Sequence, residues 1–431
     1  MSDPRREAYR ILRRVEEGGA YASILLEERA RSIADARDVG LLTELVLGVL
    51  RRRAVLDHAI SGVLSSRTID TIDAPVLAAL RIGAYSLLFL DRVPDFAAVD
   101  TAVGLARAGG AKGAAGFVNG VLRAIARRGR DLLPAAPTVG DVRGLALFHS
   151  HPLWWTEKLV GHAGWERASA ILAANNEPAP TVLAPAAPDV AARLAAEGVV
   201  TQPGAFVPEA LSVVSGVPQA TRAFREGAFW MQDEASQLVP RLFADPIGPR
   251  VADLCAAPGG KTMALATRLP PNGFVLAADR NVKRLGRVLR NLARVQLRNV
   301  QPVAIDLLAE SLALSGPFDD VLLDAPCSGT GTLRRHPEIR WRLRPTDVEQ
   351  LAGRQEQMIE RAATLVRPGG RLVYSVCSIE PEEGEQLVAR FLSGHPDFRR
   401  GETLDTAGRP GIDGFFAALL LRYSPANGGT P

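Results

Sequence analysis

Residues 251–262 of this 431-residue chain read VADLCAAPGGKT, a short apolar run followed at once by a turn of small residues and the start of a helix. A buried strand that ends in such a turn is typical of a wound α/β sheet, in which ligands bind beyond the carboxyl ends of the strands. This segment therefore predicts a wound α/β fold for the C-terminal half of the chain.

The same segment ends in GGKT, which raises the possibility of a phosphate-binding loop of a nucleotide hydrolase. That loop requires a glycine where this chain has Cys255, and Pro258 lacks the backbone N–H that the loop needs. The dinucleotide fingerprint GxGxxG is also absent from the segment. We therefore do not expect a nucleotide hydrolase.

Apolar runs and helical stretches alternate from about residue 236 onward. The runs are 251–254, 273–279, 300–306, 319–326 and 370–377, and the helical stretches are Met263–Arg268, Lys283–Val295 and Val348–Val366. Alternation of this kind predicts a parallel, Rossmann-like sheet joined by right-handed crossovers. We expect this α/β domain to span residues 236–424.

The remaining chain divides into two further regions. Apolar residues recur every three or four positions in Tyr9–Val15, Leu41–Val49, Val76–Ile82 and Val118–Ile125, which predicts an all-α domain over residues 1–135. The Pro-rich stretch Leu133–Gly140 marks a linker. Residues 141–235 mix helical stretches with short runs broken by Pro and Gly, as expected of a small α+β linking region.

Composition narrows the class of partner. The net charge is +4 and the pI is near 9.2, and all but four of the 51 basic residues are arginine. Arginine suits phosphate recognition, although a GC-rich genome explains the same bias. We find no signal peptide or membrane-length apolar stretch, and the three cysteines have no zinc-site spacing. We expect a cytoplasmic protein without a metal.

Chemically active residue types collect at the predicted strand ends. Asp279 ends the second strand, Asp306 the third and Asp324 the fourth, and Cys327 and Cys377 follow the fourth and fifth strands. Asp279 can accept hydrogen bonds from both ribose hydroxyls of an adenosine, or simply cap the next helix. A single cysteine in an apolar strand is usually a small core residue. Two cysteines at neighbouring strand ends instead suggest a thiol nucleophile beside a bound ligand.

Three motifs carry a family resemblance. The segments 253–262 (DLCAAPGGKT), 324–341 (DAPCSGTGTLRRHPEIRW) and 374–385 (YSVCSIEPEEGE) together resemble the signatures of the Nop2/Sun family of RNA 5-methylcytosine methyltransferases. The resemblance covers residues 229–420. The N-terminal domain is similar to the antitermination factor NusB, notably at Phe117–Arg123 (FVNGVLR).

The resemblance implies a chemistry and a set of site residues. Cys377 is implied as the nucleophile that attacks carbon six of a cytosine, and Cys327 as the residue that assists product release. The S-adenosyl-L-methionine site is implied to consist of Cys255, Ala256, Ala257, Pro258, Gly259, Gly260, Lys261, Asp279, Asp306 and Asp324. The sequence does not separate a cofactor role from a cytosine-edge role for Lys261 and Asp324. The target base has to be exposed or flipped out of its stack.

The resemblance further implies RNA as the partner, with 16S rRNA expected, no DNA, and a monomer. Two alternatives stay open: the same chemistry on tRNA, and a non-catalytic NusB-like RNA-binding factor. We also expect phosphate contacts from Arg334, Arg335, His336 and Arg340, and base stacking on Trp341 if that side chain is not buried.

Overall fold

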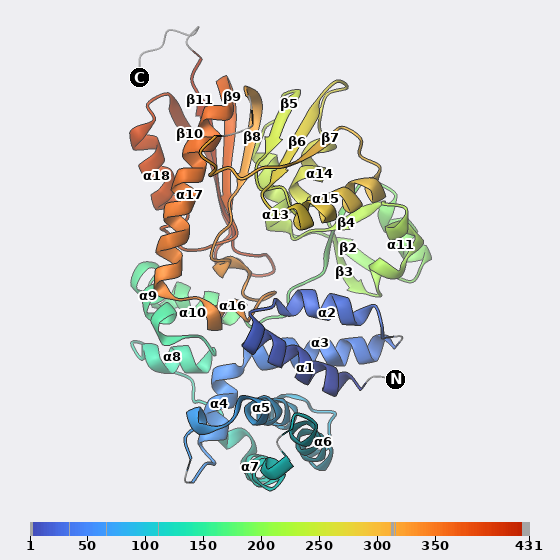
Figure 1. Cartoon of the computed structure of the whole chain (residues 1–431), viewed down its shortest axis with the longest axis vertical. Helices are drawn as coiled ribbons and strands as arrows, with labels where there is room; N and C mark the ends of the chain where they lie inside the picture. Colours follow the sequence, from blue (N-terminus) through green and yellow to red (C-terminus); the bar gives the residue numbers. More distant parts are fainter. Residues whose placement is uncertain are drawn as a thin grey trace. The chain divides into compact units, whose positions relative to one another are not determined.

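The computed structural model describes residues 3–33, 35–65, 67–110, 112–311, 314 and 316–424. The chain forms two compact units. The first, which we call the helical unit, is Met1–Pro178 with Leu333–Arg342, and the second, the sheet unit, is Ala179–Thr332 with Leu343–Pro431. Figure 1 shows helices α1–α10 in blue to green and the strands of the large sheet in yellow to red. Among the described residues no helix is long and apolar enough to cross a membrane.

The helical unit confirms the prediction of an all-α N-terminal domain. Its helices are α1 Pro4–Gly18, α2 Ala22–Ala30, α3 Ala36–Arg51, α4 Arg53–Ser61, α5 Ala74–Phe89, α6 Asp95–Ala108, α7 Ala115–Arg128, α8 Val142–Phe148, α9 Leu153–Ala163, α10 Trp165–Ala174 and α16 Ile339–Arg342. Short 3-10 turns lie at Ile69–Thr71, Lys112–Ala114 and Gly129–Leu132. Helices α8–α10 come from the region that we expected to be a small α+β segment, and they pack with the helical unit.

Helix α5 forms the centre of this unit, where it packs against α1, α3, α4, α6 and α7. Its small residues permit close approach: a Cβ at Gly83 would lie 2.5 Å from a methyl carbon of Leu122 on α7. The helix also buries Arg81, whose guanidinium is paired with Asp57 at 2.7 Å and with Glu16. This paired charge is accommodated because each donor finds a carboxylate.

Residues 333–342 leave the sheet unit and pack within the helical unit. The Arg340 side chain is buried, and its guanidinium donates to the carbonyl oxygens of Ser150 at 3.1 Å and Asn175 at 3.0 Å and to Oδ1 of Asn176 at 2.9 Å. Trp341 Nε1 donates to the carbonyl oxygen of Leu50 at 2.7 Å. The segment is therefore part of the core of the helical unit.

This burial corrects two expectations. Arg334 and Arg340 are only 6% and 3% exposed, so neither is available to an RNA phosphate. The ring of Trp341 is half-buried and lies under the Arg53 guanidinium, 5.4 Å from the centroid, which is a structural contact rather than a free stacking surface. Arg335 and His336 are half-buried, and their RNA contacts stay predictions.

We predict that Arg340→Met destabilises the protein by about 3 kcal/mol, because it leaves several buried oxygens without a donor. Methionine preserves much of the side-chain volume, so the loss of hydrogen bonds dominates. Urea unfolding measures the change. The matched control is Arg354→Met on the exposed face of α17, which should change stability by less than about 0.5 kcal/mol. Equal stability of both variants would contradict the prediction.

The sheet unit begins with a small antiparallel sheet in the order β2-β3-β1-β4. Its elements are β1 Val182–Pro185, α11 Val190–Ala196, β2 Val200–Pro203, β3 Leu211–Ser215, a 3-10 turn at Pro218–Ala220, α12 Arg222–Arg225 and β4 Phe229–Met231. Leu183, Val190 and Phe229 form its core. The mixture of short strands and helices agrees with the α+β pattern expected for the middle region.

A seven-stranded sheet follows, in the order β10-β11-β9-β8-β5-β6-β7. Its strands are β5 Arg250–Asp253, β6 Phe274–Asp279, β7 Val300–Ala304, β8 Phe318–Asp324, β9 Val366–Val376, β10 Phe398–Asp405 and β11 Phe416–Arg422. The first five are parallel to one another, as the alternation of runs and helices predicted. Strand β11 pairs antiparallel with β9, and β10 pairs antiparallel with β11; these two strands were not predicted. The strand order reverses beside β5, so the switch point of the sheet lies at its carboxyl edge.

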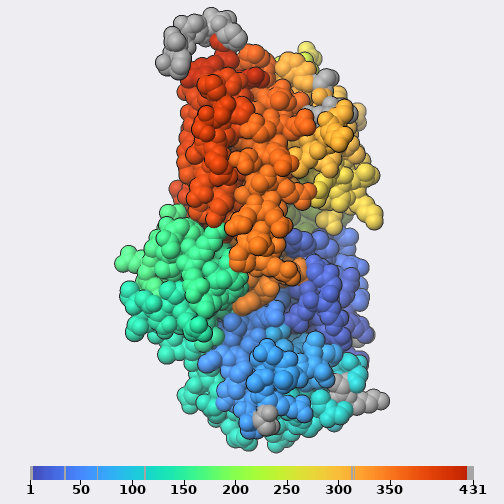
Figure 2. Space-filling view, turned by 60° about the vertical axis from the view of Figure 1, so that its left-hand side comes forward, coloured from blue at the N-terminus to red at the C-terminus, as the bar shows by residue number. Residues whose placement is uncertain are grey.

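Helices cover both faces of this sheet. They are α13 Glu234–Leu238, α14 Gly260–Ala266, α15 Val282–Val295, α17 Pro345–Leu365 and α18 Glu385–Gly394, with 3-10 turns at Val239–Leu242 and Thr330–Thr332. Figure 2 shows α17 (orange) beside the surface of α18 (red-orange), in agreement with their contacts. Val321 and Leu323 of β8 face this layer, whereas Leu322 faces the opposite one, so alternate residues fill two separate cores.

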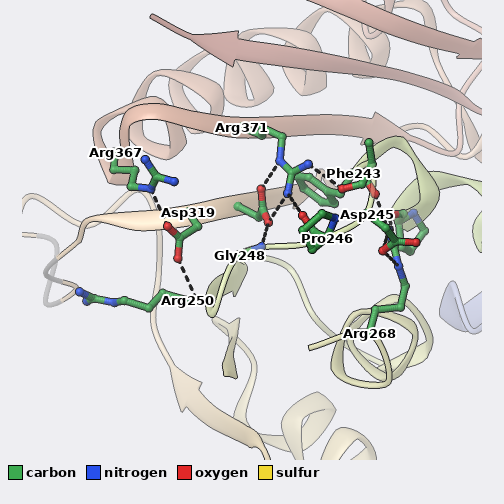
Figure 3. A network of polar contacts seen from close by, with 12 residues as sticks. Phe243, Asp245, Pro246, Gly248, Arg250, Arg268, Asp319, Arg367 and Arg371 are labelled. Carbon is green, nitrogen blue, oxygen red and sulfur yellow. Dashed lines mark hydrogen bonds and ion pairs between the residues drawn. The ribbon is translucent and has the colours of Figure 1, made fainter. Parts of the chain in front are cut away.

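Arginine–aspartate pairs brace the amino-terminal edge of the large sheet (Figure 3). Arg371 Nε donates to Asp320 Oδ1 at 2.5 Å, and the amide of Gly248 donates to Oδ2 of the same carboxylate at 2.7 Å. Arg367 Nε donates to Asp319 at 2.5 Å. Asp319 and Asp320 lie at the start of β8 and Asp324 at its end, so these pairs stabilise the edge opposite to the predicted site.

Candidate active site

The two strand-end cysteines meet. Strands β8 and β9 pair in parallel with Asp324 opposite Ser375, and Cys327 and Cys377 follow those residues at the same edge. Their Sγ atoms are 3.2 Å apart. Two thiols in contact at the carboxyl edge of a wound sheet are the arrangement that the sequence predicted.

The surroundings of two of the three cysteines favour the neutral thiol. The hydrogen bond with Cys377 and burial raise the pKa of the Cys327 thiol well above its usual value. Burial, reinforced by the charge of Asp253, also raises the pKa of Cys255. Cys327 and Cys255 are therefore neutral thiols near pH 7, and Cys255 packs as a small apolar side chain at the edge of the core.

An ion pair flanks the two thiols. Lys261 Nζ lies 2.7 Å from Asp324 Oδ2, and the hydroxyl of Ser375 donates to Asp324 Oδ1 at 2.7 Å. Lys261 also lies 4.9 Å from the centroid of the Phe415 ring. The pair joins the loop after β5 to the end of β8, and Ser375 is two residues before Cys377. The structure thus brings Lys261, Asp324, Cys327 and Cys377 together.

The loop after β5 is held in shape by its neighbours. Thr262 Oγ1 donates to Asp253 at 2.7 Å, and Arg284 on α15 donates to the carbonyl oxygen of Ala257 at 2.8 Å. Gly259 has φ +110°, a conformation that a side chain disfavours, and α14 begins at the next residue. Ala256 and Ala257 are nearly buried while Pro258 is exposed, so the loop offers mainly its backbone and Lys261 to a ligand.

The other predicted carboxylates lie at the ends of the next two strands. Asp279 is 4% exposed and accepts from the amide of Asn281 at 2.9 Å and from that of Ala257 at 3.4 Å, so it links the β6 end to the loop after β5. Asp306 is exposed, and its side chain accepts a local bond from the amide of Leu308 at 3.0 Å. Asp279 therefore belongs to the same constellation as the loop, whereas Asp306 is placed near it only by the strand order.

The carboxylates at these strand ends fit S-adenosylmethionine. Ribose hydroxyls and the ammonium group of this cofactor are hydrogen-bond donors, and its sulfonium is positively charged. The strand ends after β6, β7 and β8 each supply a carboxylate, and a carboxylate has about four acceptor positions, so Asp279 retains capacity beyond its two backbone bonds. Among the described residues, no group of three or more His, Cys, Asp or Glu side chains is arranged to hold a metal ion.

Sequence reasoning missed three residues. Asp253 accepts a hydrogen bond from Thr262, and Ser375 donates one to Asp324. Glu383 accepts from Ser328 and Ser378, the residues that follow the two cysteines. Glu383 falls within the motif YSVCSIEPEEGE, but that motif contains four glutamates and only the folded chain distinguishes them. Such contacts across strands leave no periodic signal in the sequence.

The chain is similar to known methyltransferases along most of its length. A family model described as 16S rRNA methyltransferase RsmB/F matches residues 245–421, the NusB family matches 2–127, and a ferredoxin-like domain of RsmF/B-like methyltransferases matches 151–219. The probable ribosomal RNA small subunit methyltransferase B of Bacillus subtilis is 32% identical over 92% of this chain and 90% of its own length. The chain belongs to this methyltransferase family. The Cronobacter sakazakii ribosomal RNA small subunit methyltransferase B is 33% identical over 96% of this chain and 97% of its own length.

A solved structure agrees with the architecture. The crystal structure of a protein called PH0851 is 26% identical, with a TM-score of 0.81 over 98% of this chain and 100% of that protein. Membership of the family confirms the predicted NusB-like and Rossmann-like architecture and the predicted cofactor, S-adenosyl-L-methionine. The chain is therefore an RNA methyltransferase.

We predict that Asp253→Asn changes the pH dependence of stability. Burial raises the pKa of Asp253 from 3.8 to about 7. Because the folded pKa lies above the unfolded one, the contribution of this carboxyl to stability is complete below about pH 4 and is lost as the pH rises through 7. An asparagine at this position does not ionise and still accepts from Thr262. The free energy of unfolding of the variant should therefore rise relative to that of the wild type between about pH 4 and about pH 8, by at most about 4 kcal/mol.

Urea unfolding at several pH values measures this difference. Asp189→Asn, at an exposed position before α11, is the matched control and should give a difference that does not vary with pH. A pH-independent difference for Asp253→Asn, or one of opposite sign, would show that Asp253 ionises normally in the folded protein.

Proposed function

We propose that this protein methylates carbon five of a cytosine in 16S rRNA through a covalent adduct with Cys377, and that Cys327 assists product release. The observation that carries the proposal is the 3.2 Å contact between the two sulfur atoms beside the Lys261–Asp324 pair. A single nucleophilic thiol needs no second thiol in contact with it, so the pair suggests a reaction with both an addition and an elimination step.

Carbon five of cytosine requires activation by a nucleophile. Attack of the Cys377 thiolate on carbon six forms a carbon–sulfur bond and moves the electron pair of the ring double bond toward carbon five, which becomes nucleophilic. When bound, S-adenosyl-L-methionine supplies an electrophilic methyl group. The proposed holders of this cofactor are the Cys255–Lys261 loop, Asp279, Asp306 and Asp324.

Release reverses the addition. The proton on carbon five passes to a water molecule, its bonding electrons restore the ring double bond, and the carbon–sulfur electrons return to Cys377. Cys327 lies 3.2 Å from the departing sulfur, and as a neutral thiol it can protonate that sulfur as the bond breaks. Lys261 and Asp324 flank the same edge, where they can contact the polar edge of the base.

The substrate assignment rests on the relatives and on the domain composition. Two relatives named ribosomal RNA small subunit methyltransferase B align with over nine-tenths of this chain, including its NusB-like region. Transfer RNA is the competing substrate for the same chemistry. Bisulfite sequencing of both RNAs from cells with and without the gene distinguishes the two, because only the true substrate loses its protected cytosine.

We predict that Cys327→Ala accumulates an RNA–protein adduct that survives denaturing electrophoresis, because addition proceeds and elimination fails. Cys377→Ala should abolish both methylation and the adduct, since no sulfur attacks carbon six. Labelled 16S rRNA is the probe for both. An adduct in the Cys377 variant together with normal turnover of the Cys327 variant would show that the two roles are exchanged.

We predict that Asp279→Asn weakens S-adenosylmethionine binding by about tenfold or more, the effect of losing one hydrogen bond to a charged acceptor. Isothermal titration calorimetry without RNA measures the affinity, and Asp189→Asn again serves as the exposed control. A protein that binds RNA but shows no Asp279-dependent cofactor binding would instead be a non-catalytic RNA-binding factor.

A further inference from the structure

A buried carboxylate lies between the two cysteine loops. Glu383, in the connection between β9 and α18, is 0% exposed. Its Oε1 accepts from the amide of Ser328 at 2.9 Å, and its Oε2 accepts from the hydroxyls of Ser328 and Ser378. Ser328 directly follows Cys327, and Ser378 directly follows Cys377. One carboxylate is therefore bonded to the residue after each cysteine.

The surrounding groups strengthen this link. The Ser328 and Ser378 hydroxyls are 3.1 Å apart, and the amide of Ile379 donates to Thr330 Oγ1 at 3.1 Å. The two loops that leave β8 and β9 are thus joined to each other as well as to Glu383. A displacement of either loop would break several of these bonds at once.

Helix α17 and strand β9 hold Glu383 from its other side. Gln355 Nε2 donates to Glu383 Oε1 at 2.9 Å and to the carbonyl oxygen of Pro326, the residue before Cys327, also at 2.9 Å. The Tyr374 hydroxyl donates to the backbone carbonyl oxygen of Glu383 at 2.6 Å. Both the side chain and the backbone of Glu383 are therefore fixed.

A carboxylate is a costly choice for this position. Burial raises the pKa of Glu383, and the hydrogen bonds from Ser328, Ser378 and Gln355 act against that shift. Among the described residues, no ion pair joins Glu383 to a cation. A buried carboxylate without a cation is costly. An apolar side chain in its place would leave four buried donors without an acceptor, which is costly as well. A carboxylate suits this position because its two oxygens accept four hydrogen bonds at one point.

We propose that Glu383 is a positioning residue for the covalent chemistry, which keeps the sulfur atoms of Cys327 and Cys377 in contact by bonding to Ser328 and Ser378 together. This role rests on the proposed function of the two cysteines. It extends that function to a residue that touches neither sulfur. Ser328 and Ser378 are then the links through which Glu383 acts.

The test compares Glu383→Gln and Glu383→Ala with Glu385→Ala, an exposed glutamate at the start of α18 that pairs with Arg400 at the surface. Small displacements of reacting groups cost up to about 100-fold in rate, so we expect Glu383→Ala to lower kcat by about 30- to 100-fold. Glutamine can still accept from the Ser328 amide, so Glu383→Gln should recover part of the loss. The Glu385 variant should behave as the wild type.

A purely structural role makes a different prediction. If Glu383 only supported the fold, the affinity for S-adenosylmethionine, the KM for RNA and the melting temperature would change together with the activity. We expect the cofactor affinity and KM to stay within about threefold of the wild-type values while kcat falls. Unchanged kcat in both Glu383 variants, or parallel losses in all four quantities, would overturn the proposal.

Adduct formation separates this proposal from the function on which it rests. In the Cys327→Ala background, Glu383→Ala should slow the appearance of the RNA adduct by about tenfold or more. An adduct that forms at the same rate with and without Glu383 contradicts the positioning role alone. Absence of any adduct from Cys327→Ala itself contradicts the proposed function.

A second pair of variants covers a Glu383→Ala protein that does not fold. Ser328→Ala and Ser378→Ala each remove one hydroxyl and leave the carboxylate in its pocket. We expect each to lower kcat, and their combination to add little to the effect of Glu383→Gln, because all three changes break the same link. Fully additive effects, or none, would contradict the proposal.

Discussion

The meeting of the two strand-end cysteines depends on the parallel pairing of β8 with β9. The register sets Asp324 opposite Ser375, and the chain leaves both strands at the same level, so Cys327 and Cys377 meet at 3.2 Å. A shift of one residue would turn every side chain of a strand to the other face of the sheet. The two separate cores, one against Val321 and one against Leu322, oppose such a shift. The packing of the sheet therefore determines which thiols lie in contact.

Charge is distributed unevenly between the two edges of the large sheet. At the amino-terminal edge, Arg371 and Arg367 neutralise Asp320 and Asp319, and these pairs only stabilise the fold. At the carboxyl edge, Asp253 and Glu383 are buried without an ion-paired cation among the described residues, and burial raises the pKa of both. In the large sheet, these buried carboxylates thus lie at the edge of the candidate site, and perturbed ionisable groups are common at functional sites.

The sequence predicts the parallel strands well, because strands buried on both faces read as continuous apolar runs. It also predicts the meeting of Cys327 and Cys377, since neighbouring parallel strands end at one edge. It does not predict β10, whose sequence FRRGETLD has no apolar run, and the apolar run FAALLLR of β11 was not assigned to a strand. The burial of Arg340 was not predicted either, because its acceptors come from Ser150, Asn175 and Asn176. Glu383 was missed for a similar reason: Ser328 and Gln355, two of its partners, are 55 and 28 residues away in sequence and adjacent only after folding.

Residues 333–342 belong to the helical unit, although the chain on both sides of them belongs to the sheet unit. The segment begins six residues after Cys327, and its arginine and tryptophan side chains satisfy backbone oxygens of the helical unit. A fragment that starts near Ala179 would still contain this segment, but it would lack the backbone oxygens of Ser150 and Leu50 that accept hydrogen bonds from Arg340 and Trp341. The helical unit is therefore discontinuous in sequence, with residues 333–342 inserted between two parts of the sheet unit. Recombination at a single junction cannot replace this unit with one from another protein.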